Sequence, residues 1–168
     1  MKKKYLVILL VILGINSLPL KAQNAKFQAL FIYNFSKNIE WPAGYLSSEF
    51  VIGILGSASS IENELRQIAL VKTVRNKPIK IITFPAVQNI TDCNILYIPR
   101  SRSSMLERTL VAVQNKPILI VTDKSGLRGA GINFLDNDFD LEFEINLTDL
   151  QKRGLKPDKT LIDLGIKI

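Results

Sequence analysis

Four short apolar runs divide the chain, and their spacing restricts the folds that it can adopt. The runs are rich in β-branched residues and almost uninterrupted, as in strands that are buried on both faces of a sheet. Segments with a helical pattern separate the first run from the second and the third from the fourth. This alternation predicts an α/β fold, with a mixed, largely parallel sheet flanked by helices. The runs are residues 50–56, 77–84, 94–98 and 116–122, and the helical segments are residues 57–70 and 101–114.

The last third of the chain has a different pattern. Residues 138–147 alternate strictly, with one apolar face and one acidic face, as expected for a strand with one side on the core. The segment "GINFL" and the polar turn at residues 136–138 precede it, so we expect a C-terminal antiparallel hairpin. A short helix at residues 147–155 and a terminal apolar segment at residues 160–168 complete the domain. The apolar face consists of Phe139, Leu141, Phe143, Ile145 and Leu147.

The beginning of the chain has the pattern of an export signal. Lysines at residues 2–4 precede an apolar segment, which small and polar residues follow. The apolar segment is shorter than the roughly 20 residues that a membrane-spanning helix needs. We expect residues 1–22 to be a signal peptide, cleaved after Ala22 or Ala25. Residues 23–168 would then form one exported domain that is not inserted in the membrane.

Removal of the signal weakens the case for a nucleic-acid partner. The chain has 22 Lys and Arg against 15 Asp and Glu, but four of the basic residues belong to the signal. The exported part therefore has 18 basic and 15 acidic residues, a net charge of +3. No basic run with interleaved aromatic residues follows, so we expect no nucleic-acid partner.

The residue inventory excludes much of the usual catalytic and metal chemistry. The chain has no His, which removes His-based triads and most zinc sites. No nucleophile and base can be paired, so we expect a protein that is not an enzyme and has no cofactor. The alternating Asp136, Asp138 and Asp140 suggest a calcium loop, but Leu141 and Leu147 stand where an EF-hand needs Gly and Glu. We therefore expect no metal site.

Cys93 is the single cysteine of the chain, so no disulfide can form within it. It comes just before the apolar run at residues 94–98. We therefore interpret it as a buried structural thiol.

Two loops could receive a small ligand. The first, "GILGSASS", lies where a strand meets a helix and could present N–H groups to an anion. It lacks both the Walker ending and a complete dinucleotide-binding pattern, so we favour an ordinary turn.

The second loop, at residues 122–134, contains three glycines after the end of a strand, where loops of parallel sheets often contact ligands. Its Gly residues could also serve only to allow the positive φ of a turn. We regard Asp123, Gly126, Gly129 and Asn133 as the best candidates for binding a small ligand.

The segment "FQALFIYNFSKNIEWP" is the best candidate for a protein contact. At 100° per residue, one stripe of a helix faces the sheet, with Phe31 at its margin. Phe27, Leu30 and Tyr33 project from the other flank, and Trp41 is turned out of the helix direction because Pro42 follows it. Two interpretations remain open: neighbouring segments such as the C-terminal tail bury this flank, or a second copy or a partner covers it. The stripe consists of Ala25, Ala29, Ile32, Phe35 and Ile39.

Six segments in a fixed order resemble the YfiR-like family of periplasmic proteins. The resemblance extends from about Ala25 to the C-terminus. The segments are "KFQALFIYNFSKNIEWP", "FVIGILG", "DCNILYI", "ILIVTD", "GLRGAGINF" and "LEFEINL".

The resemblance implies a periplasmic α/β domain that is not catalytic and is often dimeric. In such systems the domain represses an inner-membrane diguanylate cyclase through the periplasmic part of that enzyme, which lowers cyclic-di-GMP output and biofilm formation. The alternative is a sensor module that binds a small molecule at residues 123–133. A partner surface predicts exposed apolar residues around Phe27 and Trp41, whereas a sensor predicts a concave polar site.

Overall fold

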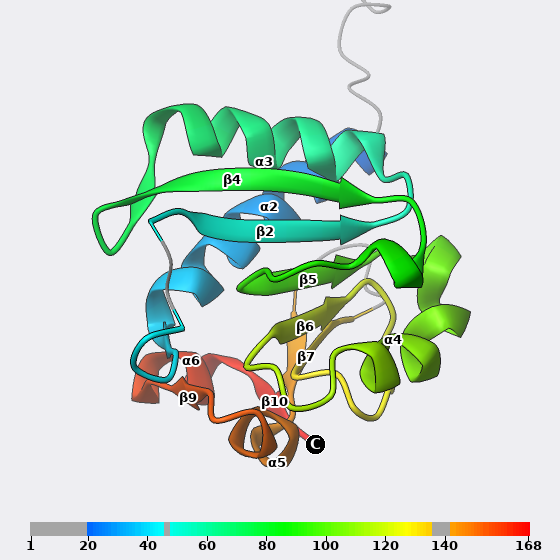
Figure 1. Ribbon diagram of the computed structural model, residues 1–168. Coiled ribbons are helices and arrows are strands. Elements are labelled where there is room, and N and C mark those ends of the chain that lie inside the picture. The colour runs from blue at the N-terminus through cyan, green and yellow to red at the C-terminus, as the bar shows by residue number, and fades with distance from the viewer. Residues whose placement is uncertain (1–19, 46–47, 136–141) are drawn as a thin grey trace, which may run out of the picture.

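An eight-stranded sheet forms the centre of the protein (Figure 1). The computed structural model describes residues 20–45, 48–135 and 142–168. Helices lie on both faces of the sheet, so the predicted α/β fold is confirmed. The strands are β2 (Phe50–Leu55), β3 (Thr73–Val74), β4 (Lys77–Phe84), β5 (Ile95–Ile98), β6 (Leu119–Thr122), β7 (Ile132–Phe134), β8 (Phe143–Ile145) and β10 (Ile166–Lys167).

The strand order is β10-β8-β7-β6-β5-β2-β4-β3. The five strands from β4 to β7 in this order are parallel to one another. Strand β8 is antiparallel to β7, with Ile132 opposite Ile145, which confirms the predicted C-terminal hairpin. The turn expected at residues 136–138 lies outside the described residues. Short strands complete both edges: β3 is antiparallel to β4, and β10 is parallel to β8.

Helices cover the two faces of the sheet differently. In Figure 1, α2 and α3 lie on one face and α4 lies on the other. Strand β5 contributes Ile95 and Tyr97 to the core under α2 and α3, and Leu96 and Ile98 to the core under α4. The central strands are therefore buried on both faces, as their sequence predicts. The helices are α2 (Leu20–Asn38), α3 (Ser59–Val71), α4 (Leu106–Ala112), α5 (Leu147–Lys152) and α6 (Lys159–Leu164).

Several elements differ from the boundaries that we expected; the helix predicted at residues 147–155, for example, ends at Lys152. The helix predicted at residues 101–114 consists of a 3₁₀ segment, η2 (Arg100–Met105), followed by α4. The strand predicted from residue 116 begins at Leu119. Pro117 has no N–H to donate to a neighbouring strand, which explains the later start. A further 3₁₀ turn, η1 (Val87–Asn89), connects β4 to β5.

The inner stripe of α2 packs on the sheet as predicted. Its five residues are 0–6 % exposed. The half-buried Phe31 adds a ring that lies edge-on to Phe35, Phe134 and Phe143, with centroid distances of 5.9–6.3 Å. Burial of four aromatic rings at this point fixes α2 against the C-terminal hairpin.

Trp41 is buried, and the expectation that it projects outward is wrong. Only 4 % of its surface is exposed, and its ring lies edge-on to Phe50 at a centroid distance of 5.2 Å. After α2 the chain becomes extended in β1 (Ile39–Glu40), which pairs antiparallel with β9 (Lys156–Pro157). Extended backbone alternates its side chains, so Trp41 points to the same side as the buried Ile39.

Candidate functional site

The outer flank of α2, defined here as Phe27, Leu30 and Tyr33, is partly open to solvent. Phe27 is 43 % exposed and Leu30 is 39 % exposed. Tyr33 is half-buried, and its hydroxyl donates a hydrogen bond of 3.4 Å to the carbonyl oxygen of Thr73 in β3. The ammonium of Lys37 lies 5.6 Å from the centre of the Tyr33 ring. The structure thus keeps these three residues together and leaves two large apolar side chains accessible.

The described part of the C-terminal segment does not cover this flank. Helix α6 contacts α2, but the chain meets α2 near its end, where the N–H of Asp158 bonds to the carbonyl oxygen of Asn38 at 2.8 Å. Leu161 fills the core from α6. Phe27 and Leu30 remain exposed beyond this contact.

More apolar surface lies on the helix beside α2. Helix α3 packs against α2, and its last two residues before the C-cap, Leu70 and Val71, are 77 % and 76 % exposed. Strand β3 follows directly, so the hydrogen bond from Tyr33 to Thr73 brings the outer flank close to the end of α3. Neighbouring exposed apolar residues are typical of a protein contact. Other exposed apolar residues of the described part, Val111, Leu164, Ile166 and Ile168, lie on or next to α4, α6 and β10.

The glycine loop after β6 borders a groove, but the polar groups of the loop are already engaged. The N–H of Gly126 donates to Glu144 at 2.8 Å, and the N–H of Gly129 donates to Asp149 at 2.9 Å. Both glycines have positive φ and both line a groove of about 800 Å³. The two carboxylates already accept hydrogen bonds from the N–H groups that an anion would need. The arrangement is therefore that of a turn held by side-chain hydrogen bonds.

The two other candidates of this loop lie in internal hydrogen-bond networks. Asn133 is fully buried; its amide nitrogen donates to Glu144 at 2.9 Å, and its oxygen accepts from Thr122 at 2.6 Å. Asp123 accepts a hydrogen bond of 2.7 Å from Gln28. Neither side chain lines the groove. Ligand binding by the four residues together stays a prediction that these contacts do not favour.

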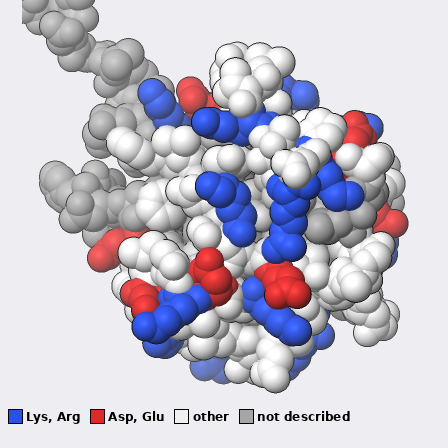
Figure 2. Space-filling model, turned by 90° about the vertical axis from the view of Figure 1, so that its left-hand side faces the viewer, with Lys and Arg blue, Asp and Glu red and all other residues white. Residues whose placement is uncertain are grey.

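Lysines, arginines and acidic residues are mixed on the side of the molecule that carries the β3–β4 turn. Figure 2 shows blue and red side chains interspersed among white ones on this face. A nucleic-acid surface would need a continuous basic stripe. The face shown therefore does not provide one.

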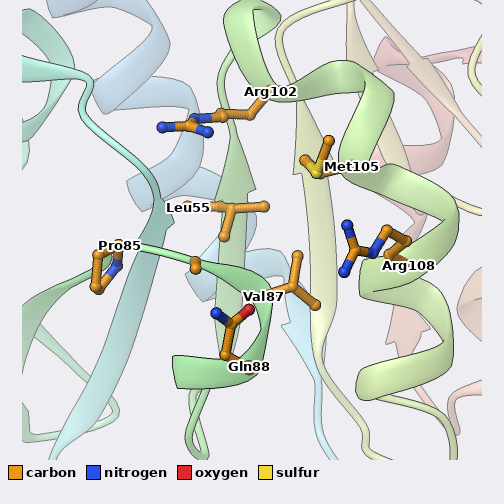
Figure 3. A pocket seen from close by; sticks show the side chains of 8 residues that line it. Leu55, Pro85, Val87, Gln88, Arg102, Met105 and Arg108 are labelled. Carbon is orange, nitrogen blue, oxygen red and sulfur yellow. The ribbon is translucent and has the colours of Figure 1, made fainter.

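A second hollow lies at the ends of β2 and β4, and the sequence reasoning missed it. Its volume is about 250 Å³, and Arg102 and Arg108 lie at its sides (Figure 3). Arg102 comes from η2 and Arg108 from α4, six residues apart across a change of helix type. A regular α-helix would have placed them on different faces, so no periodicity indicated that they share a hollow.

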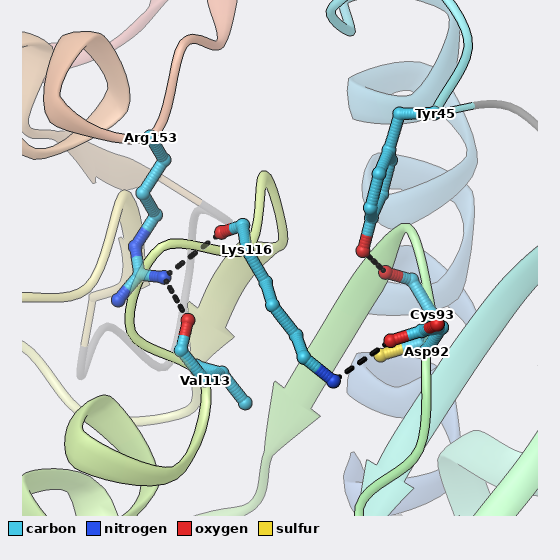
Figure 4. Close-up of polar contacts among 6 residues, drawn as sticks. All are labelled: Tyr45, Asp92, Cys93, Val113, Lys116 and Arg153. Atoms are coloured by element: carbon cyan, nitrogen blue, oxygen red, sulfur yellow. Dashed lines mark hydrogen bonds and ion pairs between the residues drawn. The ribbon is translucent and has the colours of Figure 1, made fainter.

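Cys93 is buried at the other end of the sheet, as predicted. It is 2 % exposed, and burial, with the nearby Asp92 carboxylate, raises the pKa of its thiol to about 12. Figure 4 shows its surroundings: the hydroxyl of Tyr45 donates to the carbonyl oxygen of Cys93 at 2.9 Å, and Lys116 binds Asp92 at 2.7 Å. A protonated, enclosed thiol is a poor nucleophile. The arrangement is therefore structural.

Arg153 has a similar structural role nearby. It donates to the carbonyl oxygens of Val113 and Lys116 at 3.2 and 3.3 Å (Figure 4), which closes the turn before β6. Burial lowers the pKa of its guanidinium, and Asp149 opposes this effect.

The family model described as YfiR/HmsC-like matches residues 25–165. The chain belongs to this family. The match extends from Ala25 in α2 to Gly165, directly after α6; the start of α2 and strand β10 lie outside it. A search of the curated proteins finds no significant match.

As a YfiR/HmsC-like protein, the chain is a member of a family of periplasmic regulatory proteins. Between residues 20 and 168, apart from the short stretches that the structure does not describe, no helix has the length and apolar character needed to cross a membrane. The same residues contain no group of three or more acidic or cysteine side chains that could hold a metal ion.

Proposed function

We propose that this protein is exported to the periplasm, where it binds and represses an inner-membrane diguanylate cyclase through that enzyme's periplasmic part. Its effect would be to lower cyclic-di-GMP signalling and biofilm formation. Membership of the YfiR/HmsC-like family supports the regulatory role. The export pattern of residues 1–22 supports the location.

The exposure of Phe27 and Leu30 is the observation that carries the proposal. Along one face of α2 every apolar side chain is buried, but these two are about 40 % exposed on the opposite flank. An isolated exposed apolar residue needs no explanation, whereas large ones on adjacent turns of one helix do. We assign the outer flank of α2, with Tyr33 tethered beside it, as the contact surface for the partner.

The protein also acts as a homodimer in this proposal. The exposed Leu70 and Val71 at the end of α3 give an apolar area separate in sequence from the α2 flank. The end of α3 lies close to the α2 flank, so in this proposal the dimer contact adjoins the surface that binds the cyclase.

Paired substitutions in α2 test this function. Phe27→Ala and Leu30→Ala should each relieve repression, because a contact hot spot contributes about 2 kcal/mol or more, which weakens a complex roughly thirtyfold. Cellular cyclic-di-GMP should rise while the thermal midpoint of the purified variant stays close to wild type. Phe35→Ala, on the inner stripe, should instead lower stability by about 3–5 kcal/mol.

Val111→Ala is the matched control, because Val111 is 67 % exposed on α4, on the opposite face of the sheet. Val111→Ala should change neither the cellular cyclic-di-GMP level nor the thermal midpoint. If Phe27→Ala and Leu30→Ala keep full repression, or unfold the protein as Phe35→Ala does, the α2 flank is not the contact surface.

A further inference from the structure

The connections between the parallel strands reverse direction beside the hollow that is lined by Arg102 and Arg108. From β2 the chain crosses by α3 to β4 on one side, and then returns to β5 on the other side of β2. Open α/β sheets bind ligands in the crevice at such a switch point, outside the carboxyl ends of the strands. Leu55 ends β2, Pro85 follows β4, and η2 follows β5, so residues from all three strand ends meet here.

Two guanidinium groups face this hollow without a negative partner. Within the described ranges, the side chains of Arg102 and Arg108 have no hydrogen bond or ion pair, and no acidic residue lines the hollow. The neighbouring Glu107 lines the separate groove near the glycine loop. Two like charges without a counter-charge in a small concavity favour an anion.

The floor of the hollow is apolar. In Figure 3 the side chains of Leu55 and Met105 lie between the two arginine side chains, and Val87 lies beside the guanidinium of Arg108. A volume of about 250 Å³ is slightly below the usual range of pockets for drug-sized ligands. The geometry thus suits a small molecule that has one anionic group and a compact apolar body.

Gly56 gives Arg102 the space that it occupies. Gly56 has φ +76°, and a Cβ atom placed there would lie 2.6 Å from Nε of Arg102. A side chain at this position would be strained and would displace the guanidinium. The strand-to-helix loop "GILGSASS" therefore leaves room for Arg102 over the end of β2.

We propose that this hollow, the arginine pocket, binds a small organic anion, a carboxylate or a phosphate ester, between Arg102 and Arg108. A guanidinium group can bind two oxygens of either a carboxylate or a phosphate in a bidentate manner. The apolar floor takes the body of the ligand and excludes water from the charged contact. This site goes beyond the repressor function and is separate from it, because no residue of α2 lines the pocket.

NMR titration of the exported chain with benzoate and with phenyl phosphate tests the pocket, at one fixed ionic strength because salt screens such contacts. At least one of the two should give saturable shifts of the amide signals of Gly56 and Ala86, and their relative affinity identifies the preferred anion. Benzamide, which has the same ring and no charge, should bind at least about tenfold more weakly.

Four variants complete the experiment. Arg102→Gln and Arg108→Gln should each weaken binding about tenfold or more, whereas Arg128→Gln, the same charge change on the glycine loop, should not. Ala86→Phe fills the pocket and keeps both arginines, so it should abolish binding. The site is disproved if neither anion saturates, if benzamide binds as well as both anions, if Arg128→Gln weakens binding equally, or if Ala86→Phe binds as wild type does.

Discussion

Gln28 in α2 donates a hydrogen bond of 2.7 Å to the carboxylate of Asp123, at the end of β6 and 95 residues away. The oxygen of the same amide accepts from the hydroxyl of Tyr97 at 3.3 Å. Gln28 thus links the first helix to two central strands. Asp123, a ligand candidate from the sequence, thus holds the helix that carries the proposed partner surface.

Gln28→Ala should lower the free energy of unfolding by about 1–3 kcal/mol, because the partly buried carboxylate of Asp123 loses a hydrogen bond. Urea denaturation measures this change. Lys26→Ala, an exposed substitution two residues earlier, is the control and should change stability by less than about 0.5 kcal/mol. Equal effects of the two substitutions would show that the link between Gln28 and Asp123 contributes nothing.

Trp41→Ala should destabilise the protein by about 3–5 kcal/mol, because it leaves a cavity against Phe50. That is a large share of the roughly 5–15 kcal/mol that holds a domain folded. Thermal denaturation of Trp41→Ala and Phe27→Ala, each compared with wild type, measures the difference. If Trp41→Ala has the thermal midpoint of wild type, Trp41 is not part of the core.

Stability should fall as the pH rises from about 9 to 12. Burial raises the pKa of the Cys93 thiol from about 9 to about 12, so between these values the unfolded chain has lost a proton that the folded chain keeps. Burial also raises the pKa of Tyr45 and Tyr97, which adds to the loss. Urea midpoints at increasing pH measure the trend, and Cys93→Ala should reduce its slope. A slope unchanged by that substitution would contradict the assignment to Cys93.

Reducing agents should not affect the thermal midpoint, because a 2 % exposed thiol cannot reach a second chain. A thiol reagent should label Cys93 slowly in buffer and rapidly in denaturant. A midpoint that drops by several degrees with reductant would reveal a Cys93 disulfide between two copies.

The inner stripe of α2 could be predicted because its position depends only on helix geometry. Residues such as Ala29, Ile32 and Phe35 recur at the helical period, and all are buried. The central strands are predictable in the same way, since long apolar runs have few alternatives in a domain of this size. The run at residues 77–84 corresponds to β4 without change.

Trp41 and the arginine pocket could not be predicted, because each depends on segments distant in sequence. The direction of Trp41 follows from the pairing of β1 with β9, and strands of two residues carry no sequence pattern. Arg102 and Arg108 meet the ends of β2 and β4 only through the strand order. The sequence identifies the glycine loop as a turn. It does not show that the loop is held by hydrogen bonds to Glu144 and Asp149, which come from β8 and α5.

Photo-crosslinking in cells tests the central claim most directly. A photoreactive phenylalanine analogue at Leu30, on the outer flank of α2, should crosslink to a membrane protein that carries a diguanylate cyclase domain. The same analogue at the exposed Val111 on α4 should not. Crosslinking to the cyclase from Val111 but not from Leu30, or equally from both, would contradict the assignment of the α2 flank as the partner surface.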